Sequence, residues 1–198
     1  MTESPLDAAG NVVTYAYRPS VMGAVREFKL SDDGIDWATG VRSGHITYRN
    51  IRLLRMSYRP TSIQSQRFVT ELWGEGAPKL KINSSSWKSM VEQERLDQSY
   101  SAFVRELHLR ISNVATSTCF KQGNRPLIYW PSLVVFVAVA LGLAGLIVRA
   151  LQVGASGGAA FVGAFLALYL WQGGNFLRRN RPGEYRPGAL PKEVMPPQ

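Results

Sequence analysis

Residues 129–177 decide the fold of this chain, and they read YWPSLVVFVAVALGLAGLIVRALQVGASGGAAFVGAFLALYLWQGGNFL. Arg149 is the only charged residue in this stretch. Its first apolar run, Pro131–Val148, has the length that spans a hydrocarbon core of about 30 Å at about 1.5 Å per residue. The second run, Gly157–Leu177, is diluted near its end by glycines and an asparagine but stays apolar. The sequence therefore predicts a two-helix transmembrane hairpin, with helices over 130–151 and 157–177.

Basic residues flank this hairpin on both sides. Lys121 and Arg125 precede it, and Arg178, Arg179 and Arg181 follow it, whereas the turn at 152–156 is uncharged. Because cytoplasmic flanks carry an excess of Lys and Arg, we expect a multi-pass protein with both termini in the cytoplasm. Residues 1–10 contain two acids and no apolar core, so no cleaved secretory signal is expected.

The net charge of +9 lies beside the membrane segments. It divides into +5 for residues 1–130 (17 − 12), +1 for Arg149 and +3 for residues 178–198 (5 − 2). Such placement favours attraction to anionic lipid headgroups over nucleic acid as the partner. The single cysteine, Cys119, excludes an intramolecular disulfide and a cysteine-rich metal site.

Before the hairpin, short runs of β-forming residues alternate with turn residues. The pattern predicts about six antiparallel strands at meander spacing, with Asp33-Gly34 as a hairpin turn. The expected strands are 25–30, 35–38, 45–48, 51–58, 67–73 and 79–82, and the run 12–17 is an extra strand or an arm.

From Leu96 to Val114 the apolar period changes from two to 3.6, which predicts one amphipathic helix. Such a helix is suited to plug a bent sheet or partly open barrel, and Trp37, Trp73 and Trp87 are expected in the core. The soluble part is thus an α+β domain in which one C-terminal helix caps a bent antiparallel sheet. The expected divisions are an N-terminal arm or extra strand (1–23), the domain (24–116), a linker (117–129), the two membrane helices, and a basic Pro-rich tail (178–198).

Two segments, Phe28–Ile35 and Ile46–Leu54, together with the order of strands and one long helix, carry a family resemblance over residues 24–114. The chain resembles bacterial membrane proteins with a pleckstrin-homology-like (PH-like, GRAM-like) domain. The resemblance implies a bent sheet or partly open barrel at the inner membrane, used for lipid or protein contacts and without enzyme activity. The hairpin follows the domain here, which departs from the commoner arrangement, so no ligand pocket is carried over.

The sequence offers no constellation for catalysis, metal or cofactor binding. Residues 154–158 match G-x-S-x-G, but no histidine follows them and they join two membrane helices. His45 and His108 are the only imidazoles, and neither has a ligand partner at metal-site spacing. We therefore expect neither an enzyme nor a cofactor protein.

Six arginines and no acid occur between residues 42 and 67. They are either solvated side chains on an outer sheet face or a surface that recognises anionic lipid headgroups or an acidic partner. The predicted contacts are Arg49, Arg52, Arg55 and Arg59. The chain is thus expected to be a noncatalytic membrane-anchored interaction module.

The alternative is an accessory or assembly subunit of a larger membrane complex. Small residues four apart let membrane helices pack closely, within the hairpin, in a homo-oligomer or against a membrane-protein partner. They occur at Ala138/Gly142, Ala140/Ala144, Ala160/Ala164 and Gly163/Ala167. The Pro-rich tail is expected to lack regular structure, either solvated or docked on a partner or headgroup.

Overall fold

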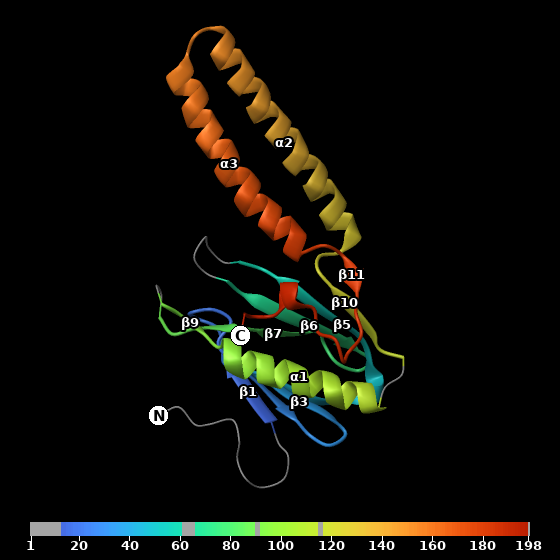
Figure 1. Cartoon of the computed structure of the whole chain (residues 1–198). Helices are drawn as coiled ribbons and strands as arrows, with labels where there is room; N and C mark the ends of the chain where they lie inside the picture. The colour runs from blue at the N-terminus through green and yellow to red at the C-terminus, as the bar shows by residue number, and fades with distance from the viewer. Residues whose placement is uncertain (1–12, 61–65, 90–91, 115–116, 198) are drawn as a thin grey trace. The chain divides into compact units, whose positions relative to one another are not determined.

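The computed structural model describes residues 13–60, 66–89, 92–114 and 117–197. The chain forms two compact units (Figure 1). Residues 1–122 and 183–198 make the first, and residues 123–182 make the second. The fold is α+β, and in chain order its elements are β1 (Val13–Tyr17), β2 (Arg26–Leu30), β3 (Gly34–Thr39), β4 (Arg42–Thr47), the 3-10 helix η1 (Tyr48–Asn50), β5 (Ile51–Tyr58), β6 (Phe68–Gly74), β7 (Leu80–Asn83), β8 (Ser85–Trp87), β9 (Gln93–Arg95), α1 (Asp97–Val114), β10 (Cys119–Gln122), α2 (Pro126–Gln152), α3 (Ser156–Arg179), β11 (Gly183–Glu184) and the 3-10 helix η2 (Lys192–Val194).

The first sheet of the soluble unit is a four-stranded antiparallel meander in the order β1-β2-β3-β4. Its strands follow the alternation in the sequence: in β2, Phe28 and Leu30 are buried while Glu27 and Lys29 are exposed. Each predicted strand in this region is confirmed, with ends shifted by up to three residues. Within the predicted run at 12–17, the described residues Val13–Tyr17 form the edge strand β1 of this sheet.

The second sheet has the order β11-β10-β5-β6-β7. Strands β5, β6 and β7 form the antiparallel meander that alternation predicts, but β10 pairs in parallel with β5. The sequence predicts a linker over 117–129, whereas residues 119–122 within it form this strand. A separate small hairpin, β8–β9, was also not predicted.

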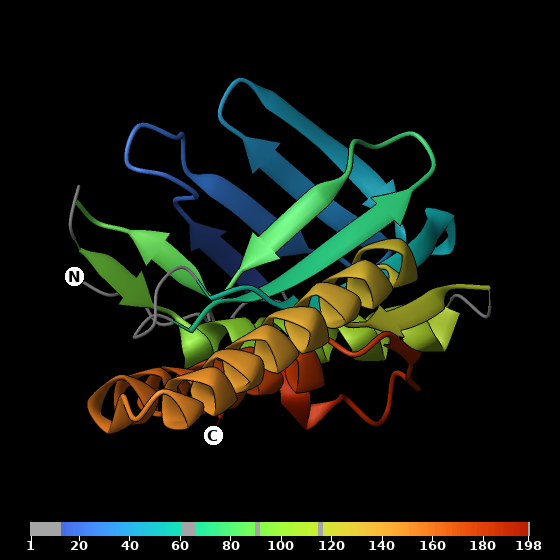
Figure 2. The same ribbon diagram turned by 90° about the horizontal axis from the view of Figure 1, so that it is seen from above.

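Aromatic side chains join the two sheets around one core. Tyr15 and Tyr17 of β1 donate hydrogen bonds to the backbone oxygens of Asn83 and Lys81, which lie at the edge strand β7. Helix α1 lies beside β1 and β3 in Figure 1, and its Tyr100 packs against Tyr15 of β1 and is hydrogen-bonded to Thr70 of β6. The helix, which Figure 2 shows from above, contributes five buried apolar residues. They are Tyr100, Phe103, Val104, Leu107 and Ile111. The predicted amphipathic helix with one buried side is therefore confirmed.

The three tryptophans expected in the core differ in their surroundings. Trp37 is buried, but Trp73 and Trp87 are only half-buried. Trp73 projects from the side of β6 opposite to Leu72, and the Lys79 ammonium stands 4.4 Å from its ring centroid. The prediction is thus wrong for Trp73 and Trp87, because β-propensity alone does not show which face of a strand is buried.

The C-terminal segment packs on the soluble unit, which contradicts the expectation that it lacks regular structure. Strand β11 pairs with β10, joining Gln122 to Gly183 and Lys121 to Glu184 in register. Further on, Val194 and Met195 are buried, and η2 contacts β5. The prolines lack backbone N–H donors, but burial of the apolar residues among them still lowers the free energy of the folded chain.

The second unit is a helical hairpin of α2 and α3. Both helices are long and apolar enough to cross a membrane, with mean hydropathies of 2.5 and 1.3, and α2 has no buried residue. An exposed apolar surface of this kind is typical of a membrane or protein interaction site. Phe136 and Tyr169 stack with ring centroids 4.8 Å apart, beside Gly173. The two helices therefore contact each other through an aromatic pair and a glycine.

Candidate functional site: a charged row across the second sheet

One row of cross-strand neighbours places a charged residue on every strand of the second sheet. In order across the sheet the members of this charged row are Glu184, Lys121, Arg55, Glu71 and Lys81. Residues opposite each other in a sheet project from the same face, so these side chains share the face opposite to the core. Lys121 and Glu184 form an ion pair of 3.5 Å at one end of the row.

At the other end of the charged row, Glu71 is surrounded by basic side chains, and its own side chain is 2% exposed. Its Oε1 lies 2.8 Å from the Lys79 ammonium, 3.3 Å from the Arg59 guanidinium and 4.0 Å from the Lys81 ammonium. The three basic side chains remain 33–44% exposed. We call Glu71, Arg59, Lys79 and Lys81 the Glu71 cluster. A buried carboxylate thus gathers three cations that stay accessible to solvent.

The four predicted arginines do not form one patch. Arg49 is exposed in η1, and Arg52 makes an exposed ion pair of 2.8 Å with Glu75. Arg55 lies in the charged row and is 8% exposed, whereas Arg59 belongs to the Glu71 cluster. Arg52 lies at a register shift between Ile51 and Leu53, and Arg55 follows in the regular part of β5. Arg52 pairs with Glu75, whereas Arg55 lies opposite Glu71.

Lys79, Lys81 and Glu71 lie outside the predicted set of contact residues. Lys79 and Lys81 precede and follow the buried Leu80, so they share the face that Leu80 does not use. That alternation was a usable signal. Their meeting with Arg59 depends on the pairing of β5, β6 and β7, which a linear scan for basic residues does not include.

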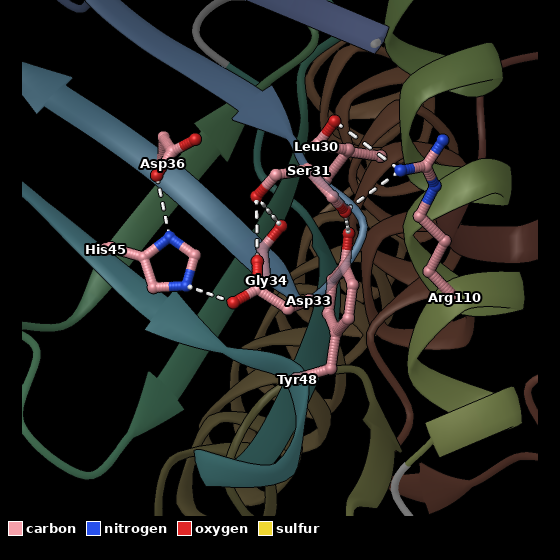
Figure 3. Close-up of polar contacts among 8 residues, drawn as sticks. All are labelled: Leu30, Ser31, Asp33, Gly34, Asp36, His45, Tyr48 and Arg110. Atoms are coloured by element: carbon pink, nitrogen blue, oxygen red, sulfur yellow. Dashed lines mark hydrogen bonds and ion pairs between the residues drawn. The ribbon is translucent and has the colours of Figure 1, made fainter. Parts of the chain in front are cut away.

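A second set of polar side chains forms hydrogen bonds at the β2–β3 turn (Figure 3). Tyr48 and Arg110 both donate to the Ser31 backbone oxygen, at 2.8 and 2.9 Å. Nearby, His45 lies 2.7 Å from Asp36 and 3.6 Å from Asp33. The Ser31 contacts tie α1 and η1 to the turn, which is a structural role.

His108 is a buried structural residue. Its Nδ1 donates to the Val104 backbone oxygen at 2.6 Å, so in the neutral ring Nε2 accepts a hydrogen bond from the Tyr185 hydroxyl at 2.8 Å. Burial lowers the pKa of His108 to about 4 and raises the pKa of Tyr185. Phe120 packs against both rings. These three residues join α1, β10 and the C-terminal segment.

The part of the chain that the structure describes contains no candidate metal site. No three His, Cys, Asp or Glu side chains within those residues could hold a metal ion. The G-x-S-x-G match, residues 154–158, lies at the turn between α2 and α3. Among the described residues, the charged row is therefore the arrangement with the clearest capacity to recognise a ligand.

No protein-family model matches this chain, and no curated protein or solved structure matches it either.

Proposed function

We propose that this protein is a noncatalytic, membrane-anchored interaction module of the inner membrane. Its PH-like domain lies in the cytoplasm with both chain termini, and it presents basic side chains to anionic lipid headgroups. The Glu71 cluster supplies the principal contacts, with Arg49 as a further exposed contact.

The observation that carries this proposal is the pairing of β10 with β11. Three residues, 123–125, connect β10 to α2, and three, 180–182, connect α3 to β11. Three residues span at most about 11 Å. The apolar hairpin is therefore an insertion within the soluble domain, attached through short connections at both ends. A domain held in this way acts at the membrane surface.

The strand order supports the PH-like part of the proposal. A four-stranded antiparallel sheet, a second antiparallel group of three strands and one capping helix follow each other along the chain. This is the order that the resemblance implies. The parallel strand β10 and the return of the C-terminal segment are additions.

The charge distribution supports an anionic surface as the ligand. The cationic ends of Arg59, Lys79 and Lys81 remain partly exposed although Glu71 is buried. Each basic side chain near an anionic membrane contributes about 1 kcal/mol of attraction. The basic flanks of the hairpin, among them Arg178 and Arg179, support the cytoplasmic orientation.

Lysine footprinting of the full chain in lipid nanodiscs tests this function. We expect acylation of Lys79 and Lys81 to be several-fold slower in discs containing phosphatidylglycerol than in discs of phosphatidylcholine alone. Lys29, exposed on β2 of the other sheet, is the internal control and should react equally in both. Equal labelling of all three lysines in the two disc types would refute the proposal.

One observation favours a second candidate, an accessory subunit of a membrane complex. The small residues of Ala138/Gly142 and Ala160/Ala164 are exposed on the hairpin. Small exposed faces allow close approach of another membrane helix. Purification in mild detergent distinguishes the candidates, because a discrete co-purifying complex that is lost in Gly142→Leu supports the accessory role and a lone protein contradicts it.

A further inference from the structure

The Glu71 cluster has a surplus of positive charge around a single carboxylate. Three cations converge on the same Oε1 atom, although one oxygen can balance only one of them. The other charges in the cluster therefore lack an equal anionic partner within it.

Two more arginines add to this surplus. Burial is the main cause that lowers the pKa of Lys81, and the Glu71 carboxylate opposes this effect. Repulsion from Lys79, Arg59 and Arg26 lowers the pKa further. The pKa of Arg67 is lowered by burial and then by repulsion from Arg59. Three basic side chains thus surround one carboxylate, a cluster charge of 3 − 1 = +2, and Arg67 adds to the positive surroundings because its Nε donates to the Arg59 backbone oxygen at 3.3 Å.

We infer that the Glu71 cluster is a binding site for a phosphate monoester group, with the Glu71 carboxylate occupying part of that site when no ligand is bound. A phosphate monoester carries close to two negative charges on three oxygens, so it can engage several cations that one carboxylate oxygen cannot satisfy together. A phosphodiester carries one charge and matches the cluster less well. The inference rests on the proposed function only in that the phosphate can belong to a lipid headgroup.

This arrangement makes a prediction of unusual sign for Glu71. Removing a charge from a binding site normally weakens binding, but here the carboxylate competes with the ligand for Arg59, Lys79 and Lys81. Glu71→Gln should therefore bind a phosphate monoester several-fold more tightly. Lys79→Ala and Lys81→Ala should each weaken binding about tenfold or more, as expected for a lost hydrogen bond to a charged group.

Trp73 provides a local optical signal. The Lys79 ammonium lies over its indole ring, so movement of Lys79 toward a bound phosphate changes the surroundings of that ring. The chain has five tryptophans, and Trp73→Phe identifies the part of the signal that belongs to this position.

The experiment titrates the full chain in non-ionic detergent with dihexanoyl phosphatidic acid, dihexanoyl phosphatidylglycerol or glycerol 3-phosphate. We expect a Trp73-dependent fluorescence change with phosphatidic acid, at least about tenfold tighter than with the phosphodiester lipid. Glycerol 3-phosphate carries the same phosphate monoester without acyl chains. If it binds as tightly as phosphatidic acid, the site takes a free phosphate monoester. If it binds much more weakly, the site takes the headgroup of a lipid. Lys29→Ala is the control for nonspecific charge loss.

The possible failures are distinguishable. Equal binding of the two lipids, reduced by Lys79→Ala, would overturn the monoester inference and leave the proposed function intact. Binding of neither lipid would overturn both. Weaker binding by Glu71→Gln would refute the competition between Glu71 and the ligand. If Glu71→Gln lowers the Tm too far for the titration, Glu71→Asp replaces it, and its shorter carboxylate should likewise tighten binding. Unchanged binding by Glu71→Asp would refute the competition as well.

Discussion

Protonation of His108 should loosen the soluble unit as the pH falls. The pKa of this imidazole is about 4 in the folded chain because burial disfavours its charged form, against 6.5 in an exposed histidine. Between these two values the unfolded chain binds more protons than the folded chain, so its free energy falls relative to the folded chain. The stability due to neutral His108 is therefore complete above about pH 6.5 and is lost progressively toward pH 4.

The magnitude follows from the two pKa values. Each pH unit between them corresponds to about 1.4 kcal/mol, so lowering the pH from 7 to 4 should cost about 3 kcal/mol through His108 alone. For a protein of this size that loss corresponds to a fall in Tm of about 6 to 12 °C. Carboxylates also titrate in this range, and the comparison with His108→Gln removes their contribution because both proteins share them.

The assay is thermal unfolding of the full chain in non-ionic detergent at a series of pH values, followed by tryptophan fluorescence. Trp37 is buried in the soluble unit and reports its unfolding. We expect His108→Gln to start from a lower Tm at pH 7 and to show a flatter dependence on pH. Parallel curves for the two proteins between pH 7 and pH 4 would refute the buried neutral imidazole.

Three further substitutions test the contacts of the C-terminal segment and the hairpin. Tyr185→Phe leaves His108 Nε2 buried without its donor and should lower the free energy of unfolding by about 1 to 3 kcal/mol, measured by thermal unfolding at pH 7; an unchanged Tm would contradict the Tyr185–His108 hydrogen bond. Val194→Ala removes two buried carbons and should cost about 1.6 kcal/mol before any cavity penalty, whereas Glu193→Ala at the exposed neighbouring position should change stability by less than about 0.5 kcal/mol. Equal effects of those two variants would show that the segment is not packed. Gly173→Leu should separate α2 from α3 because a side chain there collides with the Phe136 ring, while Gly174→Leu meets open space and is the matched control; resistance of the helices to SDS, followed by circular dichroism, should fall only in the first.

The strands and helices whose apolar residues recur at a regular spacing could be predicted from the sequence. Strands β1–β7 and α1 follow from apolar periods of two and 3.6, and the two apolar helices follow from length and composition. The packing of the C-terminal segment did not follow, because prolines and arginines dominate its composition while Val194 and Met195 supply the buried surface. Composition averages over such residues.

The binding residues illustrate a different limit. A basic run suggested four arginines, but Arg52 pairs with the exposed Glu75 whereas Arg55 lies opposite the buried Glu71. The Glu71 cluster is assembled from β6, β7 and the end of β5 by strand pairing. Charge clusters that depend on register are therefore visible in a sequence only after the strands have been paired.

Insertion of the hairpin within the soluble domain has a consequence for how the two units influence each other. Strands β10 and β11 lie immediately outside the hairpin, and the charged row continues from them through β5 and β6 to Lys81. A force that separates the ends of α2 and α3 would act first on the two-residue pairing of Lys121 with Glu184 and Gln122 with Gly183. Tyr185 follows that pairing directly and is hydrogen-bonded to His108 of α1. The same force would therefore act next on the contact between the C-terminal segment and α1. The apolar hairpin is therefore connected at both of its ends to the sheet that carries the proposed ligand site.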